Sequence, residues 1–265
     1  MGSHVKEYLA EMVGTIILLF FGTTSIIIVS GNNIFSESFI SGDDDDNNMQ
    51  ILIMGLMFSG IAALIIVSPF GKLSGGHLNP VVSLSFWLLN KMHHRDLLGY
   101  IVFQFIGAVI GSALAMLLWT DSFWDVSGGL TMPGPEISVM EAFSAELIMT
   151  FALISAILLM LSHHRTIKFT PLMIWLLIAI EVFVASSISG TSLNPARSFG
   201  PAVILNSWSD QWIYFVAPVI GSLMATLAYK KNLFGTLELR TAKLFHTSNY
   251  TCIFLQCLEA HIKRA

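Results

Sequence analysis

The side chains best suited to chemistry belong to two short motifs, one in each half of the chain. Residues 74–81 read SGGHLNPV and residues 189–196 read SGTSLNPA. In each copy a polar, glycine-containing turn leads to Asn and then Pro, which is typical of a helix capped by the Asn side chain with Pro at its first position. The amides of Asn79 and Asn194 can donate hydrogen bonds to a small polar molecule. The pattern predicts two short helices whose amino ends present such donors.

The elements that position these motifs are membrane-spanning helices. Of the 265 residues 54% are apolar and only 11% are charged, and the mean hydropathy is positive, which excludes an ordinary soluble domain. Six apolar stretches approach the ~20 residues that span hydrocarbon as a helix. The first contains Glu11 and has no small-residue cleavage site, so we interpret it as a span rather than a cleaved signal. The stretches lie at about residues 8–30, 50–70, 97–119, 141–161, 171–188 and 211–229.

The two halves also resemble each other outside the Asn-Pro motifs. Residues 10–15, AEMVGT, are similar to residues 145–150, AELIMT. Three spans per half is an odd number, so the second half enters the membrane from the opposite face. The repeats, about residues 5–120 and 138–231, are therefore predicted to be inverted.

A short apolar stretch follows each Asn, and neither is long enough to span. Residues 81–89 and 196–205 are predicted to be re-entrant half-helices. Irregular backbone before them, at residues 71–78 and 189–193, is tolerable at that depth where it is buried in protein or lines a water-filled cavity. Two half-helices that meet amino end to amino end place two positive dipole ends, each roughly half a charge, at one point. We interpret this point as the midpoint of a pore that disfavours cations, including hydronium.

Lys and Arg fall on alternate connections, which predicts the topology. Residues 31–48 and 120–137 contain neither and hold Asp and Glu instead. Connections rich in Lys and Arg stay on the cytoplasmic side, so both termini are predicted to be cytoplasmic. Arg197 is the exception, because it falls in a connection on the outer side. The predicted cytoplasmic set is Lys6, Lys72, Lys91, Arg95, Arg165, Lys168, Lys230, Lys231, Arg240, Lys243, Lys263 and Arg264.

These motifs resemble those of the aquaporin, or major intrinsic protein, family. The resemblance covers about residues 5–231 and rests on SGGHLNPV, on LNPARSFGP at residues 193–201 and on the paired Glu11 and Glu146. It implies an all-α membrane protein with six transmembrane helices and two re-entrant half-helices, and a homotetramer with one pore per subunit. Val81 departs from the Ala usual in the family, a change that packing of the half-helices is expected to tolerate. The implied pore midpoint comprises Asn79, Pro80, Val81, Asn194, Pro195 and Ala196.

The resemblance also implies a selectivity filter toward the outer mouth. Counting from the two Asn residues places it at Ser59, Val182, Thr191 and Arg197. Arg197 is expected to repel cations and to donate hydrogen bonds to solute oxygens, and Thr191 to line the wall through its carbonyl. Water-specific members carry an aromatic and a His at the positions of Ser59 and Val182, so this filter is expected to be wider and less polar. A shift of one residue would place Phe58 there and restore an aromatic.

Other features of the sequence point toward water-type members. Glycerol-type members follow the second-motif Arg with Asp, whereas this chain has Ser198. Because the filter residues touch the solute, we give them more weight than markers such as Ser198 in predicting which solutes pass. We predict a channel for water that also passes small neutral solutes such as glycerol, urea and ammonia-like molecules.

Four buried polar residues are implied to support the pore. Glu11 and Glu146 are expected to accept hydrogen bonds from the backbone of the re-entrant turns, because an unpaired carboxylate in a span is costly. His77 is expected to pack the first turn and Gln104 to hold it. Glu181, next to Val182, has no counterpart in the resemblance, and we hypothesise that it attracts cationic or ammonia-like solutes.

The remaining expectations concern the tail, partners and competing functions. Residues 1–231 are assigned to the channel domain and residues 232–265 to a cytoplasmic tail, either disordered or a short amphipathic helix. Its cysteines, Cys252 and Cys257, are expected to remain thiols, and the sequon at residues 249–251 to stay unmodified. The chain is expected to lie in the plasma membrane or a vesicle membrane.

No metal, cofactor or nucleic-acid partner is expected, and an enzyme is the least favoured class because no nucleophile, base and orienting group converge. The alternatives left open are a strict water channel, gated by cytoplasmic loops or the tail, a junctional structural protein and a coupled transporter.

Overall fold

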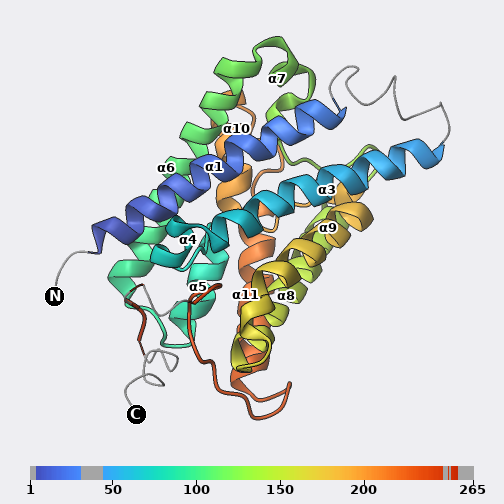
Figure 1. Cartoon of the computed structure of the whole chain (residues 1–265). Coiled ribbons are helices and arrows are strands. Elements are labelled where there is room, and N and C mark those ends of the chain that lie inside the picture. Colours follow the sequence, from blue (N-terminus) through green and yellow to red (C-terminus); the bar gives the residue numbers. More distant parts are fainter. Residues whose placement is uncertain (1–3, 31–43, 247–249, 251, 256–265) are drawn as a thin grey trace.

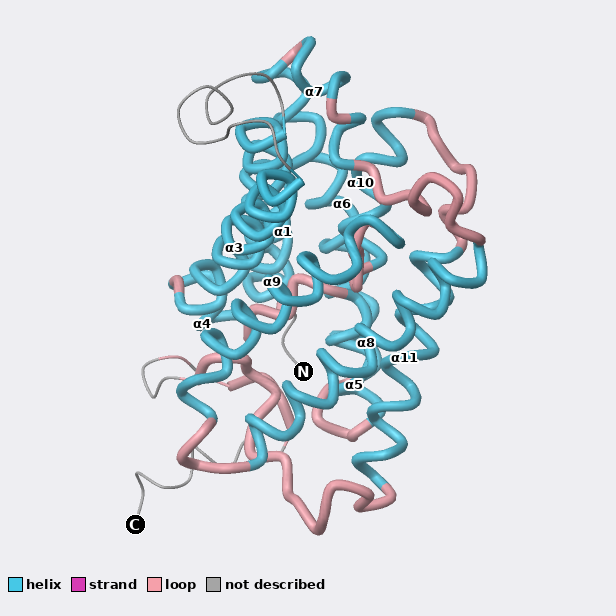
Figure 2. Tube along the Cα trace, turned by 90° about the vertical axis from the view of Figure 1, so that its right-hand side faces the viewer, coloured by secondary structure: helices cyan, strands magenta, loops and turns pink. Residues whose placement is uncertain are grey.

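The computed structural model describes residues 4–30, 44–246, 250 and 252–255. Asn249, Thr251 and Cys257, and with them most of the sequon, lie outside the described residues, as does most of the acidic connection after the first span. Within the described part every regular element is helical (Figures 1 and 2). The helices are α1 (Val5–Ser30), α3 (Asp44–Val67), α4 (Pro69–Ser74), α5 (Pro80–Leu88), α6 (His94–Trp119), α7 (Asp121–Asp125), α8 (Val139–Ser162), α9 (Thr170–Ser189), α10 (Pro195–Leu205) and α11 (Ile213–Lys230), with 3-10 turns η1 (Ser127–Gly129) and η2 (Ile167–Phe169).

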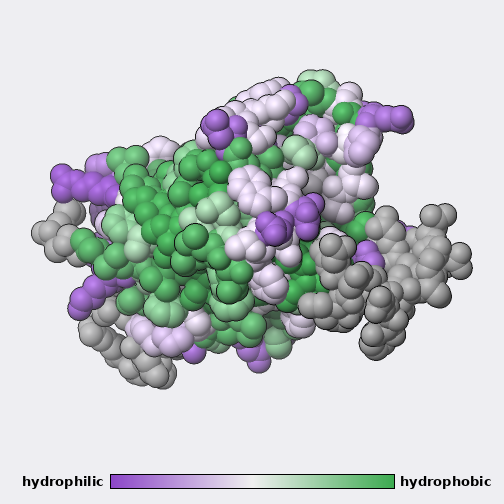
Figure 3. All heavy atoms as spheres, turned by 90° about the horizontal axis from the view of Figure 1, so that it is seen from above, coloured by the Kyte–Doolittle hydropathy of each residue, from purple (hydrophilic) through white to green (hydrophobic). Residues whose placement is uncertain are grey.

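The predicted six spans are confirmed. Six helices are long and apolar enough to cross a membrane, namely α1, α3 from Asn48, α6, α8, α9 together with η2, and α11. Large apolar side chains such as Leu64 and Leu117 stay exposed on their outer faces. Figure 3 shows hydrophobic residues over much of the left and centre of the view from above, with hydrophilic residues at its margins and in a small group near the middle. Such a surface suits lipid, while backbone polar groups are satisfied inside each helix.

Helix pairing follows the internal repeat. In the first half α1 packs on α6, and in the second half α8 packs on α11, while α3 packs on α9 across the centre. The half-helices bridge the two halves, because α10 of the second half packs mainly against α6 of the first, and α5 of the first half packs equally against α6 and against α11 of the second. Each half therefore completes the other, and α5 and α10 lie between the long helices (Figure 1).

Glycines set the spacing of the paired helices. A Cβ atom on Gly111 of α6 would lie 2.6 Å from the carbonyl oxygen of Ile16, and one on Gly221 of α11 would lie 2.4 Å from that of Leu147. No real Cβ contact is this short, so the backbones approach as closely as they do because these positions are glycine. Close contact of this kind is how helices associate in lipid.

Two local expectations need correction. The backbone of residues 71–74, expected to be irregular, belongs to the short helix α4, whose first turn is capped by the Ser68 side chain and contains Pro69. The irregular part begins only at Gly75, where φ is 102°.

The second correction concerns the conformation of the C-terminal segment, by which we mean residues 237–246 and 252–255. It is neither of the two forms expected for the tail: it contains no helix, and Leu239, Ala242, Leu244 and Phe254 are buried in the main hydrophobic cluster. It lies at the same end of the bundle as the start of α1, opposite α7 (Figure 1). We refer to these ends as the terminal end and the α7 end.

Candidate functional site

Each Asn-Pro motif begins a half-helix as its sequence predicts. The Asn79 side-chain oxygen accepts a hydrogen bond from the Val81 amide at 3.0 Å, and that of Asn194 accepts one from Ala196 at 3.0 Å. Both Asn residues have extended backbone, and Pro occupies the first helical position of α5 and α10. The caps use the amide oxygens and leave both NH2 groups facing the centre of the protein.

The two caps are joined by a reciprocal pair of hydrogen bonds. Nδ2 of Asn79 donates to the Leu193 carbonyl at 2.9 Å, and Nδ2 of Asn194 donates to the Leu78 carbonyl at 2.8 Å. Each amide nitrogen carries two hydrogens, so each keeps one further N–H for another acceptor. The amino ends of α5 and α10 are thereby fixed against each other.

The residue before each Asn has a left-handed backbone. Leu78 and Leu193 have φ of 55° and 56°, a conformation that is unfavourable for a branched side chain and persists only where the surroundings enforce it. This geometry turns the two carbonyls toward the opposite asparagine. Two buried carboxylates hold Leu78 and Leu193 in this left-handed conformation.

Glu11 and Glu146 hold the turns in matching ways. The Glu11 carboxylate accepts from the amides of His77 at 2.9 Å and Leu78 at 2.7 Å, and from the Ser74 hydroxyl at 2.6 Å. Glu146 accepts from the amides of Ser192 at 2.7 Å and Leu193 at 2.8 Å, and from the Ser189 hydroxyl at 2.8 Å. Both side chains are fully buried. Each carboxylate therefore satisfies backbone donors that have no helical partner.

Gln104 and His77 complete the first turn. Nε2 of Gln104 donates to Glu11 at 2.8 Å. The His77 ring bonds the Ser83 hydroxyl through Nδ1 at 3.0 Å and the Ala242 carbonyl through Nε2 at 2.8 Å. Because a carbonyl only accepts, Nε2 carries the proton. Burial lowers the pKa of His77, so the neutral ring is favoured.

A narrow cavity of about 100 Å³ runs past the paired asparagines. A cavity needs at least ~10–15 Å³ to hold one water, so this one has room for several water molecules. Its wall is mostly apolar, and its polar groups gather at the two re-entrant turns and at Arg197. Such a lining offers hydrogen bonds at few points along the path. The lining residues of α9 are Ile174, Ile178, Val182 and Ser186.

Arg197 reaches the cavity from α10. Its Nη1 donates to the Gly129 carbonyl of η1, which fixes the guanidinium, and the guanidinium carbon lies 5.4 Å from the centre of the Phe58 ring. The remaining N–H groups can serve a molecule in the cavity. Phe58 itself lines the cavity, so an aromatic ring stands beside Arg197.

Ser59, Val182 and Thr191 also line the cavity. The Ser59 hydroxyl donates to the Gly55 carbonyl of its own helix at 2.6 Å, so its proton is not offered to a solute. Because α3 places both Phe58 and Ser59 on the wall, the alternative of an aromatic at this position of the filter stays open. Counting along the sequence could not resolve this, since it depends on the rotation of α3 about its axis.

Glu181 lies off the path. It is buried but absent from the cavity wall, and neither carboxyl oxygen has a hydrogen-bond partner among the described residues. This placement does not support the hypothesis that it attracts solutes. In the described part of the chain no three His, Cys, Asp or Glu side chains gather as a metal site requires.

A family model and individual known proteins match this chain, and they point to the same family. The model of the family "Major intrinsic protein" matches residues 2–229. The chain is 34% identical to Aquaporin-8 of Rattus norvegicus over 171 residues, which cover 63% of this chain and 65% of that protein. It is 36% identical to Aquaporin-4 of Homo sapiens over 186 residues, covering 69% and 56% of the two chains. The aligned parts thus span less than two thirds of these relatives.

A solved structure shares the fold. The aquaglyceroporin from Plasmodium falciparum superposes with a TM-score of 0.68 and 25% sequence identity, covering 87% of this chain and 97% of that one.

Proposed function

The chain belongs to the major intrinsic protein family, and on this basis we propose that it is a passive channel for water that also passes small neutral solutes. The observation that carries the proposal is the reciprocal pair of asparagines, because it leaves two N–H donors on a narrow path with an otherwise mostly apolar wall. A molecule with an acceptor oxygen or nitrogen is bound briefly at one point and can leave again. Glycerol, urea and ammonia-like molecules are the solute class in view.

Exclusion of protons and ions follows from charge at two levels of the path. The amino ends of α5 and α10 point their positive dipole ends at the midpoint. The Arg197 guanidinium is bonded to η1, which contacts α7, and so adds a full positive charge nearer the α7 end. A water whose oxygen accepts from the asparagines is oriented so that proton transfer along the file is interrupted.

We assign the filter to Ser59, Val182, Thr191 and Arg197, with Phe58 as an additional wall residue. Val182 has neither the bulk nor the hydrogen-bonding groups of a histidine, which supports passage of molecules larger than water. The Phe58 ring beside Arg197 favours a second candidate, a strict water channel. These two possibilities differ in the solutes that pass, not in the fold.

Orientation and assembly complete the proposal. The terminal end carries Lys72, Lys91 and Arg95, which supports a cytoplasmic location for both termini. We also propose a homotetramer in the plasma membrane or a vesicle membrane. A coupled transporter is less favoured because the midpoint presents amides rather than carboxylates.

The test is stopped-flow measurement of proteoliposome volume with water, glycerol and urea. We expect Val182→His to lower glycerol and urea flux by about tenfold or more while water flux persists, since a small change in pocket size discriminates by this order. Val182→Ala is the matched variant at the same position and is expected to preserve or raise solute flux. Glycerol and urea flux equal to that of empty liposomes in the unmodified chain would leave only the strict water channel. Water flux equal to that of empty liposomes in the unmodified chain and in both variants would refute the channel.

A further inference from the structure

The C-terminal segment contributes to the wall of the cavity. Leu244 is the one lining residue, among those described, that comes from neither a spanning helix nor a re-entrant motif. It is 2% exposed and lies at the terminal end, where the neighbouring wall residues Ile66, Val82 and Ile157 are also apolar. An apolar narrowing of a water path obstructs it by excluding water.

The segment is held to the first re-entrant turn by specific hydrogen bonds. The Ala242 carbonyl accepts from Nε2 of His77 at 2.8 Å, and the Leu244 amide donates to the Gly75 carbonyl at 2.9 Å. Lys243 is completely buried and donates through Nζ to the Lys72 carbonyl at 2.7 Å. That carbonyl is at the carboxyl end of α4 and has no helical partner, so a cation suits it.

A second contact is made by Phe254. Its ring stacks on His77, with centroids 5.2 Å apart and planes at 19°, and meets Tyr100 edge-on at 6.2 Å. Position 75 favours glycine, because its φ is 102° and a Cβ there would lie 2.9 Å from the Phe254 ring. Gly75, His77 and Tyr100 thus form the binding surface for this ring, which we call the seat of Phe254. Two of these residues belong to the turn that carries Asn79.

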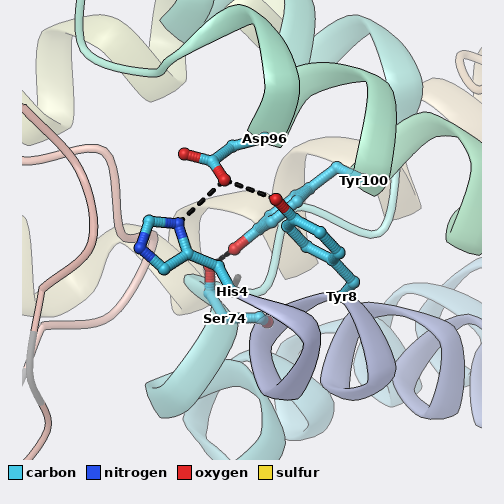
Figure 4. A network of polar contacts seen from close by, with 5 residues as sticks. All are labelled: His4, Tyr8, Ser74, Asp96 and Tyr100. Atoms are coloured by element: carbon cyan, nitrogen blue, oxygen red, sulfur yellow. Dashed lines mark hydrogen bonds and ion pairs between the residues drawn. The ribbon is translucent and has the colours of Figure 1, made fainter. Parts of the chain in front are cut away.

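The seat is itself rigid. Tyr100 donates its hydroxyl to the Ser74 carbonyl at 2.6 Å, and Asp96, one turn earlier in α6, accepts from the Tyr8 hydroxyl at 2.6 Å and bonds Nδ1 of His4 at 2.8 Å (Figure 4). These contacts tie α1 and α6 to the end of α4. The docking surface thus belongs to the scaffold, whereas the segment that docks has no helix of its own.

The segment lies outside the match to the family model, which ends at residue 229. We propose that residues 239–244 are a releasable closure of the channel at its terminal end, in which Leu244 obstructs the path while His77, Lys72 and the seat of Phe254 hold it in place. The inference rests on the proposed channel function and adds its regulation.

The experiment measures water permeability per channel in proteoliposomes for three full-length variants. Leu244→Ala shortens the obstructing side chain, Phe254→Ala weakens the dock without touching the path, and Leu233→Ala is the matched control because Leu233 is 71% exposed. We expect the first two to raise permeability by about tenfold, which corresponds to about 1.4 kcal/mol in the closure equilibrium. The control is expected to match the unmodified chain.

Proteolysis gives a second measurement, which reports directly on release of the C-terminal segment. Trypsin cleavage after the buried Lys243 requires the segment to undock, so Phe254→Ala is expected to accelerate it in detergent-solubilised protein. A rise in permeability with Leu244→Ala but not with Phe254→Ala, despite faster cleavage, would show that undocking does not open the path and would overturn the releasable closure. Permeability equal to the unmodified, conducting chain in both variants would overturn it as well. Faster cleavage with no water flux in any variant would refute the channel itself.

Discussion

Replacing Glu146 by glutamine removes the acceptor that shapes the second re-entrant turn. The carboxylate oxygens accept from the amides of Ser192 and Leu193 and from the Ser189 hydroxyl, at 2.7–2.8 Å. Glutamine keeps one acceptor oxygen and directs an NH2 group at donors, so at least one backbone N–H loses its partner in a site without solvent. Leu193, with φ of 56°, then loses the contact that enforces its conformation.

The magnitude can be worked from these contacts. One orphaned buried donor costs ~1–3 kcal/mol, and the surviving bonds weaken by about 1 kcal/mol when their acceptor becomes neutral. A total near 3 kcal/mol corresponds to a fall in Tm of about 6–12 °C for a chain of this size. Water permeability is expected to fall in parallel, since the Leu193 carbonyl no longer positions Asn79.

Thermal unfolding in detergent micelles measures the effect. Glu136→Gln is the control, because Glu136 is an exposed residue in the connection before α8. Glu11→Gln is expected to behave like Glu146→Gln, as the first turn is held by equivalent bonds. A Tm for Glu146→Gln within about 2 °C of the Glu136→Gln value would refute the reasoning, because that difference is smaller than the cost of a single orphaned N–H.

Three further predictions concern the filter, helix packing and pH. Arg197→Val is expected to raise urea and glycerol flux about threefold or more and to admit protons, measured with a pH-sensitive dye inside proteoliposomes, because the charge in the path is lost; an unchanged proton leak would contradict the role given to Arg197. Gly111→Ala is expected to cost ~1–3 kcal/mol, seen as a lower Tm, since its Cβ would meet the Ile16 carbonyl at 2.6 Å. Burial lowers the pKa of His77 from its ordinary value of 6.5, so the stability contributed by its neutral ring is present above that pH and is lost as the pH falls toward the lowered value. The Tm difference between the unmodified chain and His77→Gln is therefore expected to shrink over that interval, and a constant difference would count against it.

Much of the architecture could be predicted because membrane helices have a local signature. Length and hydropathy locate the six spans, and stretches too short to cross locate α5 and α10. The re-entrant Asn caps are visible because cap and helix are adjacent in sequence.

Contacts between distant residues have no such signature. The left-handed backbone at Leu78 and Leu193 is contrary to the local preference of leucine, so the reciprocal bonds to the asparagines could not be foreseen. The same holds for the choice between Phe58 and Ser59, which the packing of α3 decides. The apolar residues within 239–244 follow no helical or strand period. Only the burial of Leu239 and of residues 241–244 in the structure reveals that they form part of the interior.

The exchange of hydrogen bonds at the midpoint has the symmetry of an interface between subunits. Asn79 donates to the residue preceding Asn194, and Asn194 donates to the residue preceding Asn79. Such reciprocity is the defining property of a twofold interface between identical subunits, in which residue i contacts j and j contacts i. The centre of this single chain therefore has the contact pattern of a twofold dimer of three-span units. Because the two halves belong to one chain, their turns need not be identical, and His77 and Ser192 occupy matching positions while the pairing of the asparagines is symmetric.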